Sequence, residues 1–128
     1  MRNPLAIGLA PAARALLATA LREDAVRRDV TTLALVPPSA RARARVVARA
    51  PCVICGTTLA RAAFRAVDPR LRVRIRRPDG AHVRAGEPIL ELAGPARGLL
   101  TAERTALNFL QRLSGIATAR MKRLGLLL

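Results

Sequence analysis

Two periods of hydrophobic and polar residues run through the chain, and each predicts a different kind of element. From Arg41 to Arg49 basic and apolar residues alternate, which predicts a half-buried strand with its arginines on one face. The same alternation from Leu71 to Arg76 predicts a second strand. Short apolar runs at Val53–Gly56 and Ile89–Leu92 predict two more strands. The two faces of the first strand are Arg41, Arg43 and Arg45 against Ala42, Ala44 and Val46.

Three segments instead carry apolar residues three or four positions apart, the spacing of an amphipathic helix. They are residues 12–22, residues 57–67, and the stretch that Pro95 opens and Ser114-Gly115 closes. Proline suits the first position of a helix and glycine its end, while Thr57 and Thr58 are suited to cap the middle helix. The expected buried residues are Leu16, Leu17 and Leu21, then Leu59, Ala63 and Phe64, then Leu99, Ala102, Ala106, Phe109 and Leu113.

The order of these elements predicts the fold class. Grouped strands with separated helices favour an α+β fold over a doubly wound α/β sheet. The chain has 128 residues, which suits one domain, and no low-complexity linker divides it. Pro78-Asp79-Gly80 is typical of a turn between strands. Residues 1–11 are expected to form a loose leader.

Charge is the most unusual property of the composition. The formal net charge is +15, and Lys122 is the only lysine among 23 basic residues. A large positive charge suggests that the protein binds an acidic partner. However, the arginines are scattered and no aromatic residues lie between them, so the sequence argues against nucleic-acid binding. No uncharged apolar run approaches the roughly 18 residues of a membrane span, so no membrane association is expected.

The residues that could bind a metal or act as nucleophiles are few. Cys52 and Cys55 are spaced like half of a zinc site, but the chain has no other cysteine and one histidine, His82. A strand through Val53 and Ile54 would point the two thiols to opposite faces, which argues against a redox pair. We interpret both cysteines as structural and His82 as a surface residue.

The third predicted helix contains a more specific pattern. The run Glu103-Arg104-Thr105-Ala106-Leu107-Asn108, followed by Leu113-Ser114-Gly115-Ile116-Ala117-Thr118, resembles the signature of quinolinate phosphoribosyltransferase, also called nicotinate-nucleotide pyrophosphorylase (carboxylating). Periodicity alone requires neither Asn108 nor the run after the helix. The run Asp29-Val30-Thr31-Thr32 is also similar to one in this family, although Asp29 and Thr31 equally suit a turn.

The resemblance covers about Leu21 to Thr118 and implies a fold and a reaction. The implied fold is the N-terminal domain of a type II phosphoribosyltransferase, a hammerhead-like open-sheet sandwich with a long C-terminal helix. Family members convert quinolinate and phosphoribosyl pyrophosphate, with Mg²⁺, to nicotinate mononucleotide, pyrophosphate and carbon dioxide in NAD biosynthesis. They are cytoplasmic homodimers or larger assemblies.

The resemblance also assigns roles to residues. Arg104 matches the family arginine that enters a neighbouring subunit's barrel and contacts quinolinate, and guanidinium pairs well with carboxylate. Glu103, Asn108 and Ser114 are expected to support it. The family's α/β barrel follows the Ser-Gly-Ile-Ala-Thr run, whereas this sequence stops at Leu128 with a leucine-rich end typical of a truncation or a shifted reading frame.

The domain boundaries follow from this comparison. We expect the N-terminal domain over residues 12–116 and the start of a linker to a missing barrel over 117–128. No catalytic residue and no ligand for Mg²⁺ is therefore expected in this chain, which alone would be inactive unless it pairs with a barrel-bearing partner chain.

Two alternatives stay open. The chain could be a paralogue with the same N-terminal architecture, of the molybdenum-transport-associated or nicotinate phosphoribosyltransferase type. It could instead be a non-enzymatic module whose arginine-rich surface binds an acidic partner.

Overall fold

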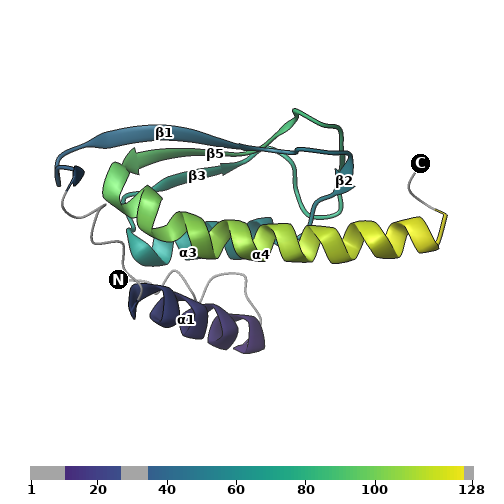
Figure 1. Cartoon of the computed structure of the whole chain (residues 1–128), viewed down its shortest axis with the longest axis horizontal. Coiled ribbons are helices and arrows are strands. Elements are labelled where there is room, and N and C mark those ends of the chain that lie inside the picture. Colours follow the sequence, from purple (N-terminus) through teal and green to yellow (C-terminus); the bar gives the residue numbers. More distant parts are fainter. Residues whose placement is uncertain (1–10, 27–34, 126–128) are drawn as a thin grey trace.

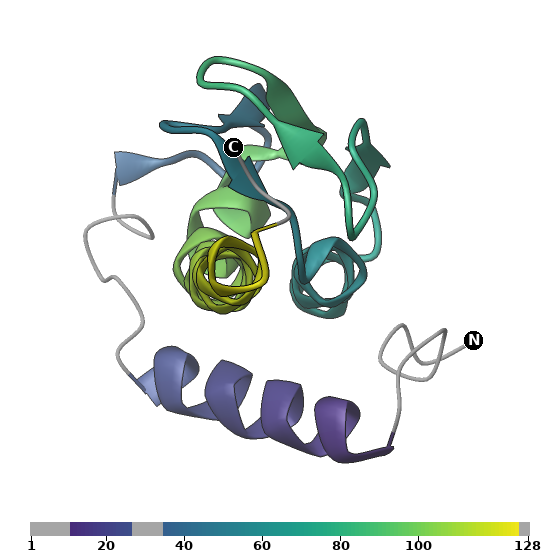
Figure 2. The ribbon, with the colours of Figure 1, turned by 90° about the vertical axis from the view of Figure 1, so that its right-hand side faces the viewer.

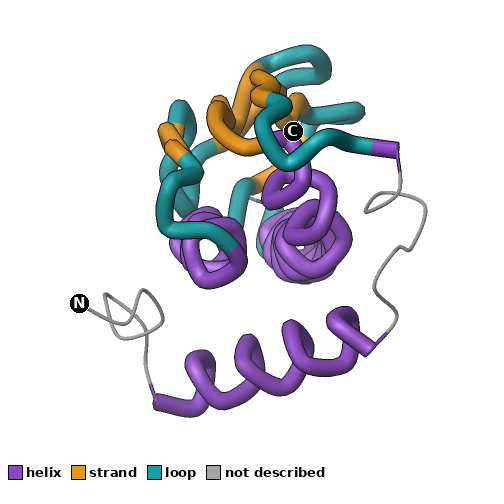
Figure 3. The backbone as a smooth tube through the Cα atoms, turned by 90° about the vertical axis from the view of Figure 1, so that its left-hand side faces the viewer, coloured by secondary structure: helices purple, strands orange, loops and turns teal. Residues whose placement is uncertain are grey.

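The computed structural model describes residues 11–26 and 35–125, which form three layers (Figures 1 and 2). A sheet forms one outer layer, helices α3 and α4 lie side by side beneath it, and α1 packs against both helices. Figure 3 shows the same layers from the opposite end. The elements are α1 (Pro11–Val26), β1 (Arg41–Val47), β2 (Cys52–Val53), α3 (Thr57–Val67), β3 (Arg72–Ile75), β4 (His82–Val83), β5 (Pro88–Pro95) and α4 (Ala96–Arg123).

The strands form two antiparallel sheets, which confirms the α+β prediction. The larger has the order β1-β5-β3, and the smaller pairs β2 with β4. In the central strand β5, Leu90 and Leu92 point into the core, while the alternate residues Glu91 and Ala93 are half-buried on the outer face. The core is aliphatic around Phe64, since the chain has two phenylalanines and no Trp or Tyr.

The first strand is correctly predicted in position but not in burial. Ala42 and Ala44 were expected to be buried and are exposed, and only Val46 of that face is partly buried. The reason is that β1 is an edge strand, and alanine side chains are too short to fill the space between it and α4. A hollow of about 300 Å³ remains there, lined in part by Ala44, Leu100 and Leu107.

Helix α1 buries a narrower stripe than predicted. Leu17 is fully buried, and Ala13 and Leu21 pack against the core one turn to either side. The expected burial of Leu16 is wrong, because its side chain lies off this i, i+4 stripe and is 58% exposed.

The start of α3 differs from the predicted threonine cap. Gly56 is the N-cap, with φ of +100°, and makes no side-chain cap. The first turn is instead satisfied across the fold by the turn residue Asp79, whose Oδ1 accepts from the Thr57 N–H (2.8 Å) and from Thr57 Oγ1 (2.7 Å). A carboxylate at a helix N-terminus also complements the helix dipole.

The predicted end of the last helix at Ser114-Gly115 is wrong. Helix α4 continues through both residues to Arg123, and Gly115 keeps a helical conformation without positive φ. The left-handed glycine that ends the helix is Gly125, with φ of +71°, whose N–H donates to the Lys122 carbonyl. Side-chain contacts of α4 with β2, described below, favour the longer helix over the local preference of glycine.

Two sequence predictions lie outside the described residues. The run Asp29-Val30-Thr31-Thr32 falls within 27–34, and the leader falls within 1–10 except for Pro11, which begins α1. The domain boundaries predicted at residues 12 and 116 stay a prediction.

Candidate functional site

Arg104 lies on the exposed side of α4, one third of the way along the helix. The adjacent positions Ala102, Thr105 and Ala106 are buried, so the backbone that carries Arg104 is fixed against the core. Within residues 11–26 and 35–125, the Arg104 guanidinium makes no hydrogen bond or ion pair. Its five N–H donors are therefore available to a carboxylate from outside this domain.

Two of the three expected supporting residues, Glu103 and Asn108, lie on either side of Arg104 along the same helix. Asn108 is one turn further on, and both Asn108 and Glu103 are exposed. Glu103 also lines the hollow between β1 and α4. Neither side chain hydrogen-bonds to Arg104 in the described part of the chain, so their supporting role stays a prediction.

Ser114 makes a different kind of contact, with the backbone that leads from β2 to α3. Its Oγ accepts from the Cys55 N–H at 3.0 Å and donates to the Cys55 carbonyl at 3.1 Å. One turn later, Thr118 Oγ1 accepts from the Val53 N–H at 2.9 Å and donates to the Ser114 carbonyl at 2.7 Å. We call Ser114 and Thr118 the hydroxyl clamp, because together they hold the β2 backbone on α4.

Sequence reasoning assigned no role to Thr118 or to the side chain of Asp79. Thr118 could have been recognised by its i, i+4 spacing from Ser114, which places both hydroxyls on one side of a helix that continues. Asp79 gave no such signal, because its partner Thr57 is 22 residues away in sequence.

A groove of about 780 Å³ lies beside the hydroxyl clamp, between α4 and the segment that joins β1 to β2. Its walls include Leu107 and Leu110 from α4 and Val47 from β1, and Lys122 lies at its edge. This groove is mostly apolar and carries no pair of acid and base suited to catalysis in the part of the chain that the structure describes.

The cysteines and His82 have no arrangement suited to metal binding. Within the described ranges, no group of three or more His, Cys, Asp and Glu side chains could hold a metal ion. Burial raises the pKa of the Cys52 thiol, and burial together with the Asp79 charge raises the pKa of Cys55, which disfavours the reactive thiolate. His82 is exposed in β4, as predicted. No helix among the described residues combines the length and hydropathy needed to cross a bilayer.

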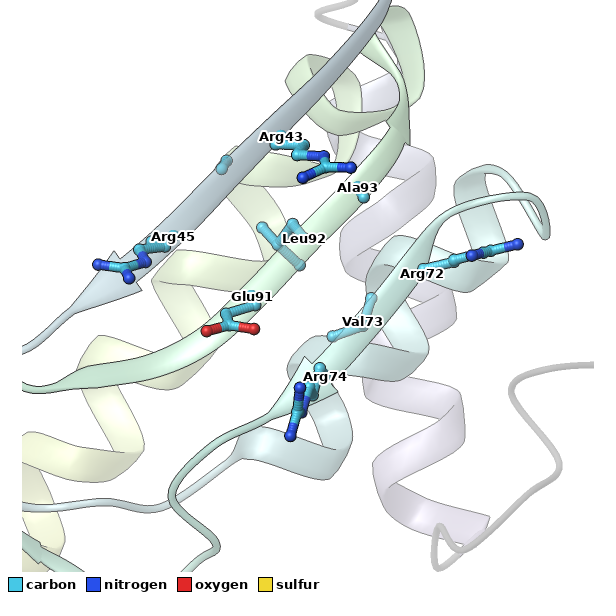
Figure 4. A pocket seen from close by; sticks show the side chains of 9 residues that line it. Arg43, Arg45, Arg72, Val73, Arg74, Glu91, Leu92 and Ala93 are labelled. Carbon is cyan, nitrogen blue, oxygen red and sulfur yellow. The ribbon is translucent and has the colours of Figure 1, made fainter.

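Arginines that are scattered in the sequence gather on the outer face of the larger sheet (Figure 4). β1 contributes Arg43 and Arg45, β3 contributes Arg72 and Arg74, and Glu91 of β5 lies between them. The sequence pattern could not show this, because the pairing of β1 and β3 with the distant strand β5 decides which arginines are neighbours.

Comparisons with known proteins agree with the signature on α4. The sequence profile described as "Quinolinate phosphoribosyl transferase, N-terminal domain" matches residues 29–114. The chain is 42% identical over 106 residues to the chloroplastic nicotinate-nucleotide pyrophosphorylase [carboxylating] of Oryza sativa subsp. japonica, and this covers 82% of the chain and 29% of the rice protein. It is 43% identical over 110 residues to the Mycobacterium leprae enzyme of that name, covering 84% of the chain and 39% of the relative.

Solved structures give the same result. NadC from Streptococcus pyogenes matches with a TM-score of 0.80 and 35% identity, over 88% of this chain and 41% of that one. The nicotinate-nucleotide pyrophosphorylase of Francisella tularensis matches with a TM-score of 0.77 and 31% identity, over 92% of this chain and 40% of that one. This sequence thus spans less than half the length of these relatives. The chain belongs to the quinolinate phosphoribosyltransferase family and carries the N-terminal domain of that family.

Proposed function

We propose that this chain acts as the N-terminal domain of a quinolinate phosphoribosyltransferase, and that Arg104 supplies a guanidinium to a carboxylate of quinolinate. The reaction would join quinolinate to phosphoribosyl pyrophosphate and release pyrophosphate and carbon dioxide, giving nicotinate mononucleotide. The observation that carries this proposal is the position of Arg104, which is exposed and unpaired on a helix whose other side is locked in the core.

Arginine suits this role for a physical reason. Quinolinate is a dicarboxylate, and a planar guanidinium can donate two parallel hydrogen bonds to one carboxylate. Because Arg104 has no carboxylate partner within the described residues, no ion pair has to be broken before substrate binds. Lysine would deliver a similar charge without the bidentate geometry.

The rest of the site would come from a barrel-bearing chain, most simply in a homodimer. Exposed apolar side chains on α4 support a contact with such a chain, because a partner would cover them. Ile116 is 65% exposed and Leu100 is 47% exposed. Mg²⁺ would enter with phosphoribosyl pyrophosphate and be held by that barrel, since the described residues offer no cluster of ligands for it. The cytoplasm is the location we propose for this assembly.

A mixing experiment tests the proposal. A full-length relative in which the arginine aligned with Arg104 is changed to Ala would be combined with this chain, and formation of nicotinate mononucleotide would be followed. Recovered activity is expected with the unchanged chain and with Arg65→Ala, a matched exposed position on α3. No recovery is expected with Arg104→Ala.

Two results would contradict the proposal. If Arg104→Ala restored activity as well as the unchanged chain does, Arg104 would not contact substrate. If sedimentation showed that the two chains associate and yet no activity returned, delivery of Arg104 across the interface would be wrong.

A further inference from the structure

The arginines on the outer face of the larger sheet are arranged in two rows across β5. In the first row, Arg43 of β1 and Arg72 of β3 both pair in register with Ala93. In the second row, Arg45 and Arg74 both pair with Glu91. The rows therefore share one geometry, in which two arginines flank a central residue, and differ only in what that residue is.

The central residue decides whether a row contains a negative charge. Glu91 brings a negative charge to the centre of the second row, although its ion pair among the described residues is with Arg76, at 3.4 Å, and not with Arg45 or Arg74. Ala93 brings only a methyl group to the first row. Among the described residues, Arg43 and Arg72 make no ion pair or hydrogen bond, so the first row has two uncompensated positive charges.

The first row also has space for a ligand. The surface over these two rows is a hollow of about 720 Å³, and Figure 4 shows the Arg43 side chain extending toward β5 beside Ala93, whereas the Arg72 side chain extends away from β5. The outer strands lie roughly 9–10 Å apart, twice the spacing of neighbouring strands. An anion above Ala93 would be reached by Arg43 as it lies and by Arg72 once its exposed side chain turns toward β5.

We propose that the row Arg43–Ala93–Arg72 binds phosphate groups of a polyphosphorylated ligand. In the second row the Glu91 carboxylate is carried by the central strand, and the guest anion would lie at the corresponding place in the first row, above Ala93. A phosphate carries more charge than one carboxylate and matches two guanidiniums better.

The ligand would be recognised through its phosphates and not through bases. The chain has two phenylalanines and no Trp or Tyr, and Phe64 and Phe109 both belong to the core, so no aromatic platform lies on this face. Free oligophosphates and the backbone of a single-stranded nucleic acid share this chemistry. The site lies on the face of the larger sheet that is remote from α3 and α4 (Figure 2), and the proposal does not depend on the proposed enzymatic function.

The test measures binding of a fluorescein-labelled single strand of about 20 nucleotides at several KCl concentrations, with inorganic triphosphate as a competitor. The variant Arg43→Gln/Arg72→Gln should weaken binding about tenfold and reduce the salt slope by about 1.4, the value for two lost contacts to single strands. The control Arg65→Gln/Arg84→Gln removes the same charge from exposed positions elsewhere and should change affinity less than about threefold.

A second variant leaves both arginines in place. Ala93→Glu would copy the second row into the first, so its carboxylate should occupy the site and weaken binding as strongly as the double variant. Its control is the single change Arg65→Gln, which lowers the net charge equally. Retained circular dichroism spectra would show that each variant is folded.

The outcomes separate the possible sources of the ligand. Displacement of the strand by millimolar triphosphate supports a free oligophosphate, and binding that only the strand achieves supports a nucleic acid. Equal losses in the Arg43/Arg72 and Arg65/Arg84 variants would overturn the proposal, since net charge alone would then explain binding. Binding of poly-L-glutamate as tightly as the strand would overturn it in favour of an acidic protein surface.

Discussion

The Ser114 hydroxyl satisfies both backbone polar groups of Cys55, accepting from its N–H at 3.0 Å and donating to its carbonyl at 3.1 Å. These groups lie just before α3, where the chain leaves β2 and has no sheet partner for them. Thr118 Oγ1 accepts from the Val53 N–H and donates to the Ser114 carbonyl within α4. The Ser-Gly-Ile-Ala-Thr part of the family signature is therefore explained by backbone docking, whereas Arg104 in the first part faces outward.

Ser114→Ala should destabilise the fold. The change leaves a partly buried N–H and carbonyl of Cys55 without their partner, which costs about 1–3 kcal/mol of unfolding free energy. Urea unfolding followed by circular dichroism measures this. Gln111→Ala, an exposed neighbour on α4, is the control and should stay within about 0.5 kcal/mol. An unchanged midpoint for Ser114→Ala would show that water replaces the hydroxyl.

Gly56→Ala should be more harmful than Gly80→Ala, although both glycines have positive φ, +100° and +90°. A methyl group at Gly56 would lie 2.9 Å from Leu113 Cδ1, whereas at Gly80 it would meet nothing within 4 Å. Both variants carry a backbone strain of about 1 kcal/mol, and only the first adds a clash with α4. Equal unfolding free energies would contradict this prediction and show that the Leu113 side chain moves to accept the methyl group. In a double-mutant cycle, Gly56→Ala should cost less in the Leu113→Ala background than in the unchanged chain.

Local patterns predicted most of the elements, because each depends on neighbours in sequence. The alternation of Arg72, Val73, Arg74 and Ile75 matches the observed exposure of β3. Arg104 was identified from its surrounding string and does lie exposed on a helix. The wrong predictions concern residues whose structure depends on tertiary contacts. Gly115 stays helical because the hydroxyl clamp holds both sides of it. Ala44 is exposed because β1 is an edge strand. The two rows of arginines on the larger sheet depend on the register of β1 and β3 against β5. The sequence of one strand does not determine this register.

Asp79→Asn should make Cys55 more reactive. The negative charge of Asp79 adds to burial in raising the pKa of the Cys55 thiol, so removing that charge should lower this pKa. Asparagine keeps an oxygen that can accept from Thr57, which preserves the start of α3. Alkylation by iodoacetamide across pH 7 to 10, read by mass spectrometry, should shift to lower pH at Cys55. Cys52, whose pKa is raised by burial alone, is the internal control. An equal shift at both thiols would contradict a specific effect of the Asp79 charge on Cys55.

Asp68→Asn should destabilise the protein at neutral pH but not in strong acid. Asp68 Oδ1 accepts from the Arg70 N–H and Nε, and its Oδ2 pairs with Arg70 Nη2 at 2.9 Å. The side-chain hydrogen bond from Arg70 is the main cause that lowers the pKa of Asp68 in the folded state. Since the folded pKa lies below the unfolded one, the carboxylate contributes stability above the unfolded value of about 3.9 and loses it as pH falls through the folded pKa.

Thermal unfolding at pH 7, 5, 4, 3 and 2 measures this dependence. The difference in Tm between the unchanged chain and Asp68→Asn should be constant from pH 7 to 5 and shrink below about pH 4, because both proteins then carry a neutral side chain at this position. Arg70 is largely exposed, with 71% of its side chain accessible, so the difference should also fall at high salt. A Tm difference that stayed the same down to pH 2 would show that the turn geometry of Asp68, and not its charge, stabilises the link between α3 and β3.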